Sequence, residues 1–119
     1  MMAEYLLLFR GGNEGRAEEF KSPEKAQAHM QKWMEWMGTL NAQGKFIGAQ
    51  PLKTNSGKVL KGKKKVLTDG PFIEGKEIVG GYLICKADSF DEAVEIAKGC
   101  PGFEHDGIVE VREIGELKM

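Results

Sequence analysis

Cysteines and long apolar runs are scarce in this sequence of 119 residues. The two cysteines, Cys85 and Cys100, are too few for a disulfide scaffold, and we expect reduced thiols in a cytoplasmic protein. The apolar stretches around Tyr5 to Phe9 and Val79 to Cys85 fall far short of the roughly 20 residues of a membrane helix. The first residues lack the basic region and long apolar run of a signal peptide. We therefore expect no contact with a membrane.

No charge of one sign dominates, and several cofactor motifs are missing. The 17 basic and 18 acidic residues give a formal net charge of -1, so the chain has no overall field to attract nucleic acid. The 16 glycines form neither GxGxxG nor a P-loop, and no HxH, HExxH or paired-cysteine spacing occurs. We expect no nucleic-acid partner, no metal and no cofactor.

What the sequence does contain indicates one α+β domain over residues 1–119. Ser22 and Pro23 start a helix that should run to about Ala42, and Asp88 or Ser89 caps a second helix over residues 90–98. Short apolar runs predict four strands, at Tyr5 to Phe9, Lys45 to Ala49, Val79 to Ala87 and Ile108 to Ile114. An apolar stripe along the first helix, expected to pack in the core, consists of Ala26, Met30, Trp33, Met37 and Leu40.

Between the second and third of these strands, residues 55–69 follow the pattern of a β-hairpin. The hairpin carries five lysines: Lys58, Lys61, Lys63, Lys64 and Lys65. They either guard a solvated edge or contact an anion, and we expect the hairpin to be peripheral to the core. The resulting order predicts a ferredoxin-like β-α-β-β-α-β fold with an inserted β-hairpin, whose antiparallel sheet carries both helices on one face.

Alternation along the strands sorts their side chains onto two faces of the sheet. The face expected to pack under the helices holds Leu6, Leu8, Leu83, Cys85, Val109 and Val111. The face expected to lack a helical cover holds Tyr5, Leu7, Phe9, Tyr82, Ile84, Ile108, Glu110 and Arg112. An uncovered face this apolar predicts a homodimer interface, a small-molecule cleft or both.

Asp69 is the first candidate for chemistry because its carboxylate stands at a Gly-Pro turn. It would act there as a general base, or it would cap the turn by accepting hydrogen bonds from backbone N–H groups. Gly70 and Pro71 suit the sharp turn, and Phe72 would close the end of a cavity.

Both histidines lie near groups that could take part in chemistry. His29 precedes Trp33 by one helical turn, where it is either a solvated edge residue or a base. His105 follows Glu104 in a predicted loop before the last strand. Because metal-binding spacing is missing there, we assign His105 as a candidate acid-base partner of Asp69.

Several segments together resemble one protein family. Residues 68–72 read Thr-Asp-Gly-Pro-Phe and residues 77–82 read Glu-Ile-Val-Gly-Gly-Tyr, followed by Cys-Pro at 100–101 and Val-Glu-Val-Arg at 109–112. With the opening strand at Tyr5 and the helix containing Trp33 and Trp36, they are similar to the DGPF-motif branch of the YCII-related family. The resemblance implies a dimeric ferredoxin-like α+β barrel, in which two open sheet faces pack around a cavity.

The resemblance also bears on activity. Some YCII-like relatives are enzymes that use a His-Asp pair, and aligning the helix end at Gly44 places Trp33 where they carry the first-helix histidine. DGPF relatives are often encoded near extracytoplasmic-function sigma factors, which suggests a regulatory association.

These observations predict a small cytoplasmic homodimer that binds a small organic molecule. The mostly apolar cavity would be edged by Asp69, Tyr5, Tyr82, Glu110 and Arg112, with Gly70, Pro71 and Phe72 beside it. As an enzyme, it would be a cofactor-free isomerase, lyase or hydrolase in which Asp69 moves a proton and Arg112 or a tyrosine stabilises the developing anion. The alternative is a non-catalytic interaction or regulatory protein.

Overall fold

The computed structural model describes residues 2–11, 22–53, 56–69 and 78–117. Its main sheet has four antiparallel strands: β1 (Ala3–Gly11), β2 (Phe46–Pro51), β5 (Val79–Ala87) and β6 (Gly107–Glu113). They lie in the order β2-β5-β1-β6, so the first and third strands of the βαββαβ unit are central and the second and fourth form the edges. This is the ferredoxin-like order, and the predicted fold is confirmed.

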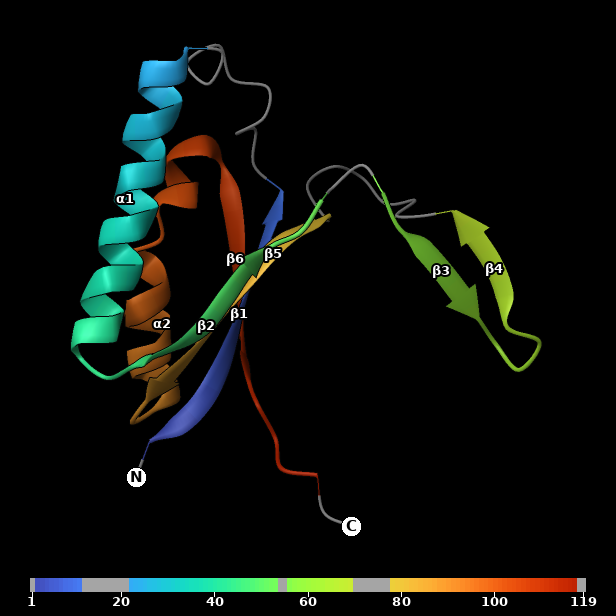
Figure 1. Ribbon diagram of the computed structural model, residues 1–119. Helices are drawn as coiled ribbons and strands as arrows, with labels where there is room; N and C mark the ends of the chain where they lie inside the picture. The colour runs from blue at the N-terminus through green and yellow to red at the C-terminus, as the bar shows by residue number, and fades with distance from the viewer. Residues whose placement is uncertain (1, 12–21, 54–55, 70–77, 118–119) are drawn as a thin grey trace.

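Two helices cover one face of this sheet (Figure 1), namely α1 (Pro23–Ala42) and α2 (Phe90–Lys98). Pro23 begins α1 as predicted, and Ser89 caps α2 by accepting a hydrogen bond on Oγ from the Glu92 N–H at 3.1 Å. The segment around His105, predicted as a loop, is instead a short 3₁₀ helix, η3 (Pro101–His105). No helix among the described residues is long and apolar enough to cross a membrane.

The predicted hairpin is present as β3 (Lys58–Lys61) and β4 (Val66–Asp69), which form a separate two-stranded sheet. Leu60 pairs with Leu67 across it, and Gly62 takes a left-handed conformation (φ 73°) in the turn. Figure 1 shows the hairpin standing away from the main sheet, on the side opposite the two helices.

The strand register corrects the predicted faces of β1. Tyr5 lies opposite Cys85 and Leu7 opposite Leu83, and directly opposed residues of an antiparallel pair share a face. Tyr5 and Leu7 are therefore part of the core under the helices, where they are 3% and 0% exposed. Phe9 lies on the same face, so the prediction that these three side chains are on the uncovered face is wrong.

The error on β1 has a physical cause. Every residue of β1 from Tyr5 to Phe9 is apolar, so alternation alone cannot tell its two faces apart. The register decides it, because the small Cys85 and the absent side chain of Gly81 leave room for the rings of Tyr5 and Phe9. Leu6 and Leu8 consequently lie on the uncovered face. The assignments made on β5 and β6 agree with the register: the covered face has Leu83, Cys85, Val109 and Val111, and the uncovered face has Tyr82, Ile84, Ile108, Glu110 and Arg112.

Candidate functional site

A cavity of about 320 Å³ lies between the middle of α1, from His29 to Met37, and one end of the main sheet. This volume is at the lower end of the roughly 300–1,000 Å³ typical of small-molecule sites. Apolar side chains predominate in its walls: Phe9, Met30, Trp33, Met37, Ala49, Pro51 and Val109. Arg10, Gln50 and Tyr82 also border the cavity, although the register directs their side chains to the uncovered face. His29 is the polar side chain that reaches it from α1.

The cavity forms because β5 has glycines at this end of the sheet, where larger side chains would fill the space beside the aromatic rings. Gly80 and Gly81 of β5 line it, and Gly81 lies opposite Phe9 in the register. The Phe9 ring packs edge-on against Trp33 at 5.1 Å between centroids and against Trp36 at 6.1 Å. These rings form a wall that is fixed by its neighbours.

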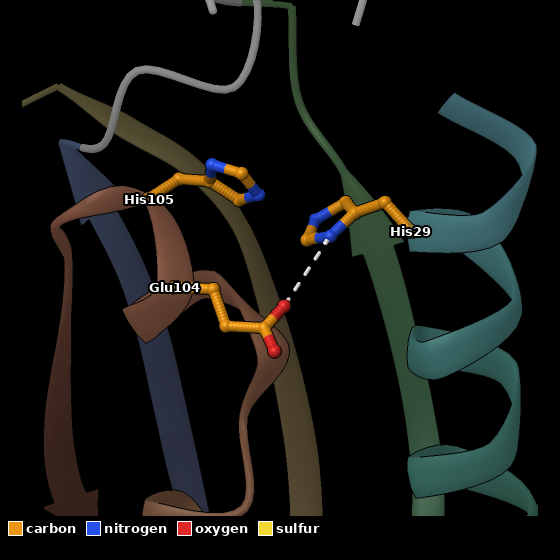
Figure 2. A group of neighbouring side chains, drawn as sticks. All are labelled: His29, Glu104 and His105. Carbon is orange, nitrogen blue, oxygen red and sulfur yellow. Dashed lines mark ion pairs between the residues drawn. The ribbon is translucent and has the colours of Figure 1, made fainter. Parts of the chain in front are cut away.

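His29 projects from α1 into a polar cluster at this end of the molecule (Figure 2). Its Nε2 accepts a hydrogen bond from the Trp33 Nε1–H at 2.9 Å. Its Nδ1 lies 3.9 Å from Glu104 Oε2, which is an ion-pair distance and too long for a hydrogen bond. The His105 ring meets the His29 ring edge-on at 4.8 Å between centroids. With a side chain only 11% exposed, His29 reaches both this cluster and the cavity.

Glu104 is held from the other side by Lys32 of α1. Lys32 Nζ donates to both carboxylate oxygens, at 2.9 and 3.1 Å, and so ties η3 to the helix. These hydrogen bonds lower the pKa of Glu104 against the effect of desolvation, and the charges of Lys32, His29 and His105 lower it further. Glu104 therefore stays ionised next to His29 at neutral pH.

The ligand atoms of His29, Glu104 and His105 lie within 4.8 Å of one another, close enough to raise the question of a metal ion. A neutral imidazole has one N–H and one lone pair. Because the His29 lone pair on Nε2 accepts the Trp33 hydrogen bond, its proton is on Nδ1, facing Glu104. A metal there would need the Nδ1 lone pair and a carboxylate that Lys32 already holds. The arrangement favours proton exchange over metal binding.

The predicted ligand-binding residues on the main sheet do not lie together in the folded protein. Tyr82 borders this cavity, but its side chain lies on the uncovered face, so its predicted place in a cavity between two subunits stays a prediction. Tyr5 lies in the core instead, with its ring edge-on to Phe90 at 5.5 Å, because the register turns it under the helices. Glu110 and Arg112 are on the uncovered face, where Arg112 donates to Glu110 at 3.2 Å and Arg10 Nε lies 3.6 Å from the same carboxylate.

Asp69 ends β4, with its backbone opposite Lys58 in the hairpin. Its side chain and the whole of Gly70, Pro71 and Phe72 lie outside the described residues. Their roles as base, turn and cavity plug stay predictions.

Sequence reasoning did not identify the pairing of His29 with Glu104. The spacing of His29 and Trp33 by one helical turn was a usable signal, because residues at i and i+4 can bond on a helix surface. Nothing in the sequence indicated that η3 brings Glu104 and His105 to the same place. Arg10, at the end of an apolar strand, was also not singled out, although it borders the cavity.

Comparisons with known proteins place the chain in a family. No curated protein matches it. Among solved structures it is similar to the 5-chloro-2-hydroxyhydroquinone dehydrochlorinase of Burkholderia phenoliruptrix, in a complex with 2,5-dihydroxybenzoquinone. The two are 19% identical, with a TM-score of 0.40, over 89% of this chain and 90% of the other. The model of the YCII-related domain matches residues 5–118, and the chain therefore belongs to the YCII-related family.

Proposed function

We propose that the cavity binds a small organic molecule about the size of one aromatic ring, and that His29 exchanges a proton with it. The observation that carries this proposal is the setting of His29. It combines a place in the wall of a mostly apolar cavity, a basic nitrogen oriented by Trp33, and an ionised carboxylate behind the ring.

The chemistry follows from the two ring nitrogens. Nε2 carries the lone pair, so a ligand hydroxyl or acidic C–H that replaces the Trp33 N–H can give its proton to that atom. The imidazolium that forms is stabilised by the charge of Glu104 near Nδ1. Arg10 also borders the cavity, but its Nε lies 3.6 Å from the Glu110 carboxylate on the uncovered face, so we assign it no part in binding the ligand. Such a site supports a cofactor-free isomerase or lyase.

Asp69 is the second candidate for the base, through the sequence Asp69 to Phe72 that marks the DGPF branch. In this version Asp69 takes the proton, with His105 as its partner. If His29 is the base, His29→Gln loses proton transfer, and if Asp69 is the base, Asp69→Asn loses it. One experiment with both variants therefore distinguishes the two candidates.

We also propose a homodimer, in which a second copy covers the free face of the main sheet. Among the described residues no helix covers that face, and Leu6, Leu8, Ile84 and Ile108 lie on it. A non-catalytic regulatory role, including one tied to sigma factors, is the alternative. It is favoured by the lysine-rich hairpin, which would suit an anionic partner. A cytoplasmic location accords with either role.

The test uses 4-nitrophenol, whose ionisation changes its colour. Titration should quench tryptophan fluorescence in a saturable way, because Trp33 lines the cavity, with a Kd on the order of 1 mM or tighter. Bound 4-nitrophenol should also ionise at a lower pH than free 4-nitrophenol, since His29 takes its proton and Glu104 stabilises the imidazolium that forms.

Three variants interpret the result. His29→Gln should still bind 4-nitrophenol but lose the easier ionisation, whereas Met34→Ser, on the exposed side of α1, should behave as wild type. Loss of the effect in Asp69→Asn, with His29→Gln unchanged, would transfer the role to Asp69. Absence of saturable quenching would refute the ligand cavity itself.

A further inference from the structure

The β3–β4 hairpin exposes apolar side chains that its own subunit does not cover. Leu60 and Leu67 face each other across the two strands and are 65% and 59% exposed, and the neighbouring Val66 is 54% exposed. Among the described strands, β3 and β4 pair only with each other. A two-stranded hairpin alone is at best marginally stable in water, so a folded hairpin of this composition needs a surface to pack against.

The dimensions of the chain also indicate a missing partner. A compact protein of 13.2 kDa exposes about 6,400 Å² to solvent, whereas this chain exposes 8744 Å². The excess of about 2,300 Å² is larger than the roughly 800 Å² that each partner buries in a standard interface. The molecule is a flat body, 47 × 46 × 18 Å, with the hairpin extending from it.

The position of the hairpin indicates which partner it meets. It projects on the side of the main sheet that carries no helix (Figure 1), and this is the face proposed above to receive a second copy. A copy seated there would lie beside the hairpin, which would add its own apolar pair to the interface.

Charge points to the same partner. The hairpin, residues 58–69, contains five lysines and one aspartate, a net charge of +4, which leaves -5 for the rest of a chain whose total is -1. Each subunit thus offers a positive hairpin and a negative body to its copy, and a symmetric dimer brings both pairs together.

We propose that the hairpin is an arm that packs on a second copy of this chain, with Leu60 and Leu67 buried against the partner subunit and the lysines facing its acidic body. The inference rests on the proposed homodimer. It adds that the dimer depends on the hairpin as well as on the sheet face.

The first test compares the dimer dissociation constants of two variants by analytical ultracentrifugation. Leu60→Ser combined with Leu67→Ser should weaken the dimer at least about 100-fold, because both arms lose their buried apolar pairs. Met34→Ser removes an equally exposed apolar side chain from the helix side, and should leave the dissociation constant unchanged. Raising the salt concentration should also weaken the wild-type dimer.

The second test identifies where the arm lies. Protein labelled with ¹⁵N is mixed with unlabelled protein, allowed to exchange subunits, and treated with a zero-length carbodiimide that joins lysines to carboxylates. After full exchange of equal amounts, about half of the cross-links from the hairpin lysines should join one labelled to one unlabelled peptide, because about half of the dimers are then mixed.

The outcomes separate the two proposals. A wild-type monomer at micromolar concentration overturns both the dimer and the arm. A wild-type dimer that the double variant does not weaken, or hairpin cross-links found only within one subunit, overturns the arm and leaves the sheet-face dimer intact.

Discussion

The helix-covered face of the sheet has two ends that are built from similar residues. One end is closely packed, and the other surrounds a cavity. At the closed end, defined by Tyr5, Leu40, Cys85, Ala93 and Ala97, every side chain is at most 4% exposed. At the open end, around His29, Met30, Trp33, Phe9 and Gly81, the same face surrounds a cavity. Helix α1 contributes to both ends, with Leu40 at the closed end and His29, Met30 and Trp33 at the open end.

The difference arises from β5 and from the second helix. At the closed end β5 presents Cys85 and α2 adds Ala93 and Ala97, so the space under α1 is filled. At the open end β5 presents Gly81, and the short η3 replaces a full helix. An apolar helix stripe therefore makes a core only where the facing elements supply side chains, and makes a cavity wall where they do not.

Two substitutions on the same stripe of α1 test this comparison with the largest expected effect. Leu40→Ala, at the closed end, should lower the free energy of unfolding by about 3 kcal/mol, because it leaves a cavity among packed neighbours. Met30→Ala, at the open end, should change it by no more than about 0.5 kcal/mol, since Met30 is 59% exposed. Urea unfolding measures both. Equal losses would show that the two ends are packed alike.

The second prediction fills the open end from the sheet side. A Cβ on Gly81 would lie 3.0 Å from Gln50 O and 3.3 Å from Pro51 Cα, both backbone atoms of β2. Gly81→Ala should therefore cost about 1–3 kcal/mol as β2 shifts. It should also weaken 4-nitrophenol binding several-fold by narrowing the cavity. Unchanged binding in a folded Gly81→Ala protein would mean that the ligand does not reach β5.

A third prediction concerns a glycine with no such neighbour. Gly38 lies inside α1, and a Cβ there would have no atom within 4 Å. Gly38→Ala should raise the free energy of unfolding by about 0.5–1 kcal/mol, because it restricts the unfolded chain and favours the helix. Thermal unfolding measures the gain. A loss of stability would contradict the open surroundings of Gly38.

The sequence predicted the helices and strands well. It did not predict that the apolar stripe of α1 lines a cavity at one end instead of packing in the core. Pro23 and Ser89 are local signals, so the helix starts could be predicted from neighbouring residues alone. The stripe from Met30 to Leu40 has the helical period along its length, but period says nothing about what faces it. Only the register, which places Gly81 beneath one end and Cys85 beneath the other, separates wall from core.

The candidate site was harder to predict than the fold because its parts meet only in the folded chain. His29 lies next to Glu104 directly, and Lys32 fixes that carboxylate through a bond that spans 72 residues of sequence. Composition and spacing identify each side chain but not such a contact. Asp69 could be proposed from the sequence because its turn is formed by adjacent residues. The His29 cluster has no such local pattern, apart from the spacing of His29 and Trp33.

The smallest predicted effect uses pH to distinguish the two ends. At the closed end burial raises the pKa of the Cys85 thiol above its ordinary value of 9.0, and burial, followed by the charge of Glu113, raises that of Tyr5 above 10.0. At the open end hydrogen bonds from Lys32 lower the pKa of Glu104 below 4.5. A bond from Lys45 does the same for Glu92 at the closed end, so acid affects both ends.

The loss of stability at high pH therefore distinguishes the closed end from the open end, whereas the loss at low pH does not. Cys85 and Tyr5 are neutral in the folded protein but ionise on unfolding above their ordinary pKa values, so their stabilisation is complete below about pH 9 and declines as the pH rises further. The exposed Lys98–Glu95 pair acts in the same direction but contributes little. Tyr5→Phe combined with Cys85→Ala should flatten the fall in the free energy of unfolding between about pH 8.5 and 10.5, measured by urea unfolding at each pH. Glu104→Gln should leave that alkaline slope unchanged while reducing the loss in acid. If the free energy of unfolding falls as steeply with pH in the Tyr5 and Cys85 double variant as in wild type, ionisation at the closed end does not cause the alkaline loss of stability.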